Sequence, residues 1–331
     1  MEAELIPGLP DDMALECLLR LPFHDLASAR RVCKRWRQEI TSQSFYSLRK
    51  AGGHARPLVV LVPSSFYCAP RYKNLIIFDP TMGVLTRLPV VFNWSSYCRV
   101  AAVGHELVGL CGDELYGATV EVYNLLTGVR RRGATMPGPR RVRFAFAVTA
   151  EARMAYVAGG ENEHREPLQS ALAMTWRRTR GGIFVNGAFC VAGGQGSHDW
   201  TFETFNVAEG RWTAKQVKLL EEALIDPSAG VAAVEGRVYT CRWHGEVDVI
   251  SNDVGGVGGW QRLGVFSPNV YGLFGLPPVH LVAWNGGLMM LGITLQTGRI
   301  ACILEEGKWR RMLMPMEFAT GHVQSLCSFQ L

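Results

Sequence analysis

Few residues in this chain of 331 stand at spacings that suit catalysis. His164 and His198 lie next to Glu163 and Asp199, and such neighbours are able to form an acid–base or metal-binding pair. Residues adjacent in sequence usually point apart, however. The chain also has no nucleophile elbow, phosphate-binding loop or histidines at metal-ligand spacing. We therefore predict a protein that is not an enzyme and that uses no cofactor or metal.

The cysteines and the net charge narrow the function further. Nine cysteines form an odd number and include no C-x-x-C pair, which disfavours zinc and thioredoxin-like redox chemistry. We interpret them as reduced core residues of an intracellular protein, in the cytoplasm or nucleus. The net charge of +5 is small, and the arginine clusters at 130–132, 140–143 and 177–180 come with no recognition helix. No apolar run reaches the roughly 18 residues that span a bilayer, and the acidic N-terminus is not a secretory signal. Nucleic acid and membrane are thus not expected partners.

The first 50 residues have the periodicity of short helices. Apolar residues recur at the spacing of one helical face, and aspartates stand where they can cap a helix. We expect three helices: one after Asp11-Asp12 that ends near Leu21-Pro22, one capped by Asp25, and one that carries Cys33, Trp36 and Ile40 toward Phe45. A segment this small, without disulfide or metal, buries few of its own apolar side chains. The remainder must pack against a partner or against the rest of this chain, and these residues alone favour neither.

A family resemblance favours the partner. The stretches 5–12, 14–18, 20–22, 29–36 and 45–46 together resemble an F-box. The resemblance implies docking onto the Skp adaptor of a cullin-RING ubiquitin ligase, with no chemistry in the F-box itself. The residues implied to bind the adaptor are Leu9, Pro10, Leu15, Leu18, Leu21, Val32, Cys33 and Trp36.

After residue 56 the pattern changes to strands. Pairs of apolar runs flank tight turns at 100–110, 144–158, 183–192, 230–240 and 281–291. Asn186-Gly187 and Asn285-Gly286 suit two-residue primed turns, because both turn residues need positive φ. Later strands carry Trp212, Trp260 and Trp309 just after a glycine. A period of about 40 to 50 residues is typical of propeller blades, and the glycine and tryptophan pattern resembles kelch repeats.

Counting second strands predicts six blades. The first blade lacks an inner strand, and residues 323–331 alternate in a way that would supply it and close the ring. The third unit is about a dozen residues shorter than the others, and its outer strand is missing after the run 170–174. The sequence does not distinguish a functional adaptation from a defective splice or gene-model variant.

Loops at one end of the propeller are the predicted target-binding site. Because the strands of a blade alternate in direction, the connections after second and fourth strands emerge at the same end. These are 63–74, 89–97, 113–118, 137–142, 161–169, 195–200, 215–228 and 266–276. They are rich in the aromatic and arginine residues that dominate interfaces. The predicted target-binding residues are Tyr67, Arg71, Tyr72, Trp94, Tyr116, Arg140, Arg141, Arg165, His198 and Trp200.

The predicted fold is thus a small all-α F-box at 1–50 followed by an all-β kelch propeller at 57–331. Nearly the whole chain is similar to plant F-box/kelch-repeat proteins. The resemblance implies the substrate-recognition subunit of an SCF (Skp-cullin-F-box) ubiquitin ligase, with phenylalanine ammonia-lyase or type-B response regulators of cytokinin signalling as the class of target. The alternative is a kelch propeller that acts as an interaction scaffold without a ligase.

Overall fold

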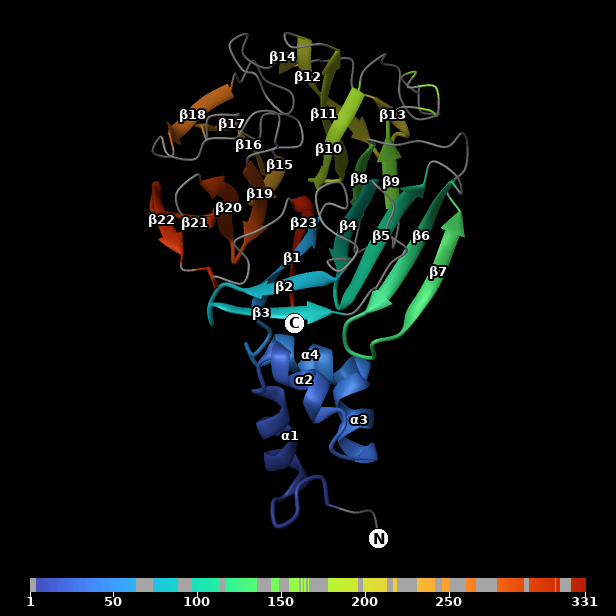
Figure 1. Ribbon diagram of the computed structural model, residues 1–331, viewed down its shortest axis with the longest axis vertical. Coiled ribbons are helices and arrows are strands. Elements are labelled where there is room, and N and C mark those ends of the chain that lie inside the picture. Colours follow the sequence, from blue (N-terminus) through green and yellow to red (C-terminus); the bar gives the residue numbers. More distant parts are fainter. Residues whose placement is uncertain are drawn as a thin grey trace.

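A computed structural model shows a helical segment standing against one end of a propeller-like ring of sheets (Figure 1). It describes residues 4–63, 74–88, 97–113, 117–135, 144–148, 155–160, 162, 164, 166, 178–195, 199–212, 217–218, 231–241, 246–250, 260–265, 279–294, 298–312, 314–315 and 323–331. Over these ranges, no helix has the length and apolar character that a membrane crossing requires. The predicted order of an all-α segment followed by a β region is confirmed.

Residues 4–51 contain four helices, not the three that we predicted. They are α1 (Asp11–Leu19), α2 (Phe23–Ala29), α3 (Lys34–Thr41) and α4 (Gln43–Ala51). The hydroxyl of Ser42 accepts a hydrogen bond from the amide of Phe45 at 3.0 Å, so Ser42 caps α4 and separates it from α3.

The predicted aspartate caps are also wrong. Pro10 and Pro22 hold the cap positions of α1 and α2, where a residue with fixed φ and no N–H costs little. Asp11 and Asp25 lie instead in the first turns of these helices. A carboxylate there still favours the helix, because it faces the positive end of the helix dipole.

Within the described residues, the strands form six sheets, most of them in simple antiparallel order. The first sheet contains β23 (Val323–Gln330), β1 (Pro57–Pro63), β2 (Leu75–Asp79) and β3 (Val84–Leu88). The second contains β4 (Tyr97–Val103), β5 (Glu106–Asp113), β6 (Gly117–Asn124) and β7 (Arg130–Thr135). Two later sheets have the same four-stranded order. One contains β15 (Val231–Val234), β16 (Arg237–Cys241), β17 (Glu246–Ile250) and β18 (Trp260–Val265). The other contains β19 (Val279–Trp284), β20 (Gly287–Thr294), β21 (Gly298–Glu305) and β22 (Lys308–Met312).

The predicted hairpins are confirmed, and so are their turns. Asn186 and Gly187 have φ of 48° and 76°, and Asn285 and Gly286 have φ of 50° and 74°. The same turn recurs at Glu235-Gly236 and Glu306-Gly307, where glutamate takes φ of 48° and 51°. We had not expected glutamate in this position, because a residue with Cβ rarely adopts positive φ.

Ring closure by the end of the chain is also confirmed. Strand β23 pairs antiparallel with β1, from Pro57 opposite Gln330 to Pro63 opposite Val323. The inner strand missing from the first sequence unit is therefore supplied from the other end of the chain. This pairing covers the edge that β1 would otherwise expose.

The middle of the ring departs from the repeat. Strands β8 (Ala145–Val148) and β9 (Ala155–Ala158) form a two-stranded sheet. The outer strand predicted to be missing after 170–174 lies outside the described residues. The next sheet, of β10 (Arg178–Val185), β11 (Ala188–Gln195), β12 (Asp199–Asn206) and β13 (Arg211–Trp212), gains a fifth strand, β14 (Val217–Lys218), which pairs with β12. Strand β14 falls in the predicted loop 215–228, so that loop prediction is wrong at these residues. A count of six complete blades stays a prediction.

Candidate functional site

The helical segment and the ring share one hydrophobic core, which runs across the predicted boundary between residues 50 and 57. Leu18, Ile40 and Phe45 from the helices belong to the same cluster as Leu58 and Leu107 from the ring, and all five are buried. The sequence left open whether the apolar helical side chains pack against a partner or against this chain. The structure shows that Leu18, Ile40 and Phe45 pack against this chain and not against a partner.

Aromatic pairs mark two places where the helices touch the ring. The ring of Phe23 at the start of α2 meets Phe329 of β23 edge to face, with centroids 6.2 Å apart. Tyr46 of α4 meets His105, in the turn between β4 and β5, at 5.0 Å. Such pairs contribute about 0.5–1.5 kcal/mol beyond the area that they bury. The contacts thus tie the helices to two neighbouring sheets.

Arg30 adds a polar contact with the second sheet. Its guanidinium donates to the carbonyl oxygen of Leu126, in the turn between β6 and β7. Partial burial lowers the pKa of Arg30, and the phenol of Tyr123 opposes that shift. His105 and Leu126 both lie in turns within hairpins, so the helices occupy that end of the ring. The connections after second and fourth strands leave from the opposite strand ends.

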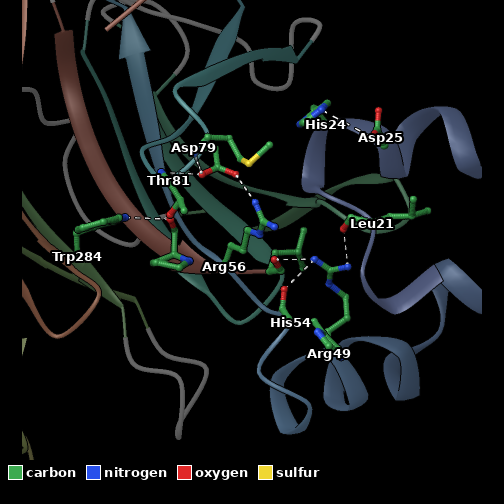
Figure 2. A network of polar contacts seen from close by, with 12 residues as sticks. Leu21, His24, Asp25, Arg49, His54, Arg56, Asp79, Thr81 and Trp284 are labelled. Carbon is green, nitrogen blue, oxygen red and sulfur yellow. Dashed lines mark hydrogen bonds and ion pairs between the residues drawn. The ribbon is translucent and has the colours of Figure 1, made fainter. Parts of the chain in front are cut away.

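Arg49 of α4 is the most deeply buried charged group at this joint, with 1% of its surface exposed. Its guanidinium donates to four backbone oxygens: Leu19 at 2.5 Å, Leu21 at 2.8 Å, His54 at 3.2 Å and Leu331 at 3.3 Å. Figure 2 shows the side chain between Leu21, in the connection from α1 to α2, and His54, in the linker that leads to β1. Burial lowers the pKa of Arg49 to about 10, so the group stays protonated at neutral pH.

The linker after α4 is held on its ring side by further polar groups (Figure 2). The amide of Arg56 donates to the backbone oxygen of Leu331 at 3.0 Å, and the amide of Leu331 donates to the carbonyl oxygen of Arg56 at 3.1 Å. These bonds extend the β1–β23 pairing by one residue on each strand. The Arg56 guanidinium lies 4.0 Å from the buried carboxylate of Asp79, and the indole of Trp284 donates to the carbonyl of Pro57 at 2.9 Å.

Other apolar side chains of the helical segment are exposed to solvent. Met13, Val32 and Leu48 are exposed by 55%, 62% and 44%. Met13 lies one helical turn before Cys17, which is also exposed, so the two share one side of α1. These side chains are accessible to a partner, but apolar side chains exposed one at a time are also common on protein surfaces.

The predicted adaptor-binding residues fall into three groups. Pro10, Val32 and Cys33 are exposed, whereas Leu18 lies in the core. The remaining four are partly buried: Leu9, Leu15, Leu21 and Trp36. Contact of all eight with the adaptor stays a prediction. For Leu18 a direct contact would require the helix to leave its present packing.

Polar bonds fix the segment that precedes α1. The indole of Trp36 donates to the carbonyl of Leu5 at 2.7 Å, and the carboxylate of Asp11 accepts from the amide of Leu5 at 3.0 Å. The Leu5 amide bond and the Arg35 guanidinium lower the pKa of Asp11. These bonds hold the segment that precedes α1 against α1 and α3, and the predicted residues Leu9, Pro10 and Trp36 lie in this part of the F-box.

The predicted target-binding loops lie mostly outside the described residues. Nine of the ten predicted residues lie outside the described residues: Tyr67, Arg71, Tyr72, Trp94, Tyr116, Arg140, Arg141, Arg165 and His198. Trp200 lies in strand β12, where it is paired with Gly194, so the predicted loop 195–200 is shorter than expected. In the described ranges no three His, Cys, Asp or Glu side chains gather as metal ligands would.

Sequence reasoning missed the residues of the joint. The residues that connect the helices with the ring are Phe23, Arg30, Tyr46 and Arg49, and Met13 and Leu48 are further exposed apolar side chains. Phe23 and Met13 had a usable signal, since each is a large apolar residue within the F-box-like segment. Arg49 had none, because an arginine in the last turn of a helix usually faces solvent and complements the helix dipole.

A small helical segment joined to a propeller-like ring is the arrangement expected of an F-box protein with a β-sheet partner domain. The F-box domain family matches residues 6–48. F-box/kelch-repeat protein At1g80440 of Arabidopsis thaliana is 30% identical over 99% of this chain and 100% of that protein. F-box/kelch-repeat protein At1g15670 of the same plant is 32% identical over 72% of this chain and 77% of its own length. F-box/kelch-repeat protein SKIP20, also of that plant, is 44% identical over 52% of this chain and 51% of its own length. This chain belongs to the F-box/kelch-repeat family.

Proposed function

We propose that the chain is the substrate-recognition subunit of an SCF ubiquitin ligase. The observation that carries the proposal is the match of residues 6–48 to the F-box domain family, in a segment that packs Leu18, Ile40 and Phe45 into a core shared with the ring and leaves Met13 and Val32 exposed. The exposed Pro10, Val32 and Cys33, with the partly buried Leu9 and Trp36, would bind a Skp-type adaptor and through it a cullin. Met13 and Cys17, which are exposed on one side of α1, are further candidates for this contact.

The mechanism that follows is proximity, without a reactive group in this chain. The F-box would fix the chain to the ligase, and the loops at the far end of the ring would hold a target protein. A target lysine held beside a charged conjugating enzyme reacts at a raised effective concentration. We therefore propose a non-catalytic adaptor that acts in the cytoplasm or nucleus, with its sheets forming a ring of six blades.

The proposed targets are phenylalanine ammonia-lyase or type-B response regulators. Support for this finer assignment is the resemblance to plant F-box/kelch-repeat proteins and the aromatic and arginine content of the predicted loops. A reconstituted ligase that contains this chain should attach ubiquitin to one of these proteins. If the ligase binds the adaptor but modifies neither protein, the target assignment is wrong and the proposed ligase role remains.

Adaptor binding is tested by a matched pair of charge substitutions. Val32 in the F-box and Val129 in the ring are similarly exposed, at 62% and 60%. A Val32→Asp variant should lose the Skp adaptor and cullin in a pull-down, because it buries a charge in the contact. A Val129→Asp variant should retain both. An unsubstituted chain that captures neither adaptor nor cullin would instead favour a propeller scaffold without a ligase.

A further inference from the structure

Arg49 joins three segments that are far apart in the sequence. Leu19 is the last residue of α1 and Leu21 lies in the connection from α1 to α2. His54 lies in the linker, and Leu331 continues the ring-closing strand. The last carbonyls of a helix have no partner within the helix, and a buried carbonyl without a partner is costly. One guanidinium satisfies backbone oxygens from all three segments with charge-assisted bonds.

Leu331, the acceptor on the ring side, is itself held in place by hydrogen bonds. Leu331 forms two backbone hydrogen bonds with Arg56, directly beyond the pairing of Pro57 with Gln330. The backbone oxygen that Arg49 reaches is therefore fixed to the strand pair that closes the ring. Turning the F-box about the linker would break the bonds from Arg49 to His54 and Leu331 together. Lysine offers no planar fork and would not span the same acceptors.

We propose that Arg49 is a positioning residue that fixes the propeller at one orientation relative to the F-box. The consequence for ubiquitin transfer rests on the function proposed above. A rigid joint holds a bound target at one distance from the ligase, whereas a flexible joint lets the target sample many distances. Arg49 would thus determine which lysines are reached, and it would do so without touching the adaptor or the target.

The first test measures the joint in the free chain. Arg49→Lys is compared with Arg20→Lys, since Arg20 is an exposed arginine of the same F-box. Fluorescent labels introduced at the exposed Gln38 and Ala208 report the distance between F-box and ring. Arg49→Lys should broaden the distance distribution and speed hydrogen exchange at the Arg56 and Leu331 amides by roughly tenfold or more. Arg20→Lys should leave both unchanged. An unchanged distance distribution in folded Arg49→Lys would overturn the proposal.

A second variant covers the case in which Arg49→Lys does not fold. Deleting Leu331 removes the acceptor on the ring side and leaves Arg49 bonded to Leu19, Leu21 and His54. The distance distribution should again broaden while the amides of α1 to α4 remain protected. A narrow distribution in this variant would contradict the proposal as directly as in the first.

The second test uses the reconstituted complex with the Skp adaptor, cullin and RING subunit. The chain has six lysines, Lys34, Lys50, Lys73, Lys215, Lys218 and Lys308, whose self-modification can be mapped by mass spectrometry. With Arg49→Lys, ubiquitin should spread to more of the ring lysines, while adaptor affinity changes less than about twofold. An identical lysine pattern in wild type and variant would contradict the proposal. A wild-type chain that fails to bind the adaptor refutes the proposed function alone, because the distance measurement stands without it.

Discussion

Side chains of the F-box differ sharply in exposure according to what they contact. Phe45 and Arg49, which face the shared core and the ring, are each 1% exposed, whereas Met13 and Val32 are more than half exposed. Burial of a large apolar side chain contributes about 1.5–3 kcal/mol to folding, and exposed side chains contribute little of this. The buried side chains thus stabilise the fold of this chain, and the exposed ones are available to a partner.

The difference also shows where the F-box obtains its stability. Its buried side chains form one cluster with strands of the ring, so removal of the ring would expose them. A helical segment of this length has too little interior of its own to compensate. We therefore expect the F-box and the first two sheets to unfold together, while substitutions on the exposed surface leave unfolding unchanged.

The largest effect is expected at the aromatic contact between α2 and β23. Phe329→Ala should lower the free energy of unfolding by about 3–5 kcal/mol, because it removes a buried ring that packs on Phe23 and leaves a cavity. Thermal unfolding followed by circular dichroism should show helices and strands losing structure in one shifted transition. A helical transition that stays at the wild-type temperature would show that the F-box folds independently of the ring.

A smaller effect is expected at Asp79, beside the linker. Its carboxylate accepts from the amides of Thr81 and Met82 at 2.9 and 3.1 Å and lies 4.0 Å from Arg56. Asp79→Ala should cost about 1–3 kcal/mol in urea unfolding, because it removes both the turn bonds and the buried partner charge. Asp79→Asn keeps an acceptor for the turn and should cost less. Equal costs for the two variants would assign the whole effect to the charge.

Alkaline pH should weaken the ring through its buried thiols. Burial raises the pKa of Cys190 to about 11 and of Cys302 to about 12, from an ordinary value of 9.0. The unfolded chain then loses these protons at lower pH than the folded chain, so stability is full below pH 9 and falls as pH rises toward 11 or 12.

The size of this loss is on the order of 1 kcal/mol per thiol at pH 10. Urea midpoints measured from pH 7 to 10 report it, and Cys302→Ala should flatten the decline. Cys17 and Cys33, which are exposed on the F-box, should react with a thiol reagent in the folded protein long before Cys190 and Cys302 do. Rapid labelling of Cys302 at neutral pH would contradict its burial.

The ring was largely predictable because its signals are local. Alternating apolar runs and the turns at Asn186-Gly187 and Asn285-Gly286 specify hairpins from residues adjacent in sequence. Ring closure followed from a counting argument, since a first unit without an inner strand needed one from elsewhere. The helical count failed for a reason equally local: Ser42 caps α4 and ends a spacing that otherwise continues from Ile40 to Phe45.

The joint between the F-box and the ring was not predictable in the same way. Arg49 and Leu331 are 282 positions apart, and nothing near either residue indicates the other. Their contact exists because ring closure brings the end of β23 to the linker after α4. The exposed surface was predicted in part, since helical spacing identifies apolar positions but not which of them the ring covers. Leu18 and Val32 looked equivalent in sequence, yet one is buried and the other is exposed.

The smallest effect on folding is expected at Met13, an exposed residue of a helix that also carries the buried Leu18. Met13→Gln should change the free energy of unfolding by no more than about 0.5 kcal/mol, because the side chain is 55% exposed and leaves no cavity. If α1 binds the adaptor, the same substitution should weaken that binding by about fivefold, or about 1 kcal/mol. Calorimetric titration of the adaptor together with urea unfolding separates the two quantities. A variant that loses stability and keeps its adaptor affinity would reverse the roles assigned to the two groups of side chains, because Met13 would then belong to the fold and not to the docking surface.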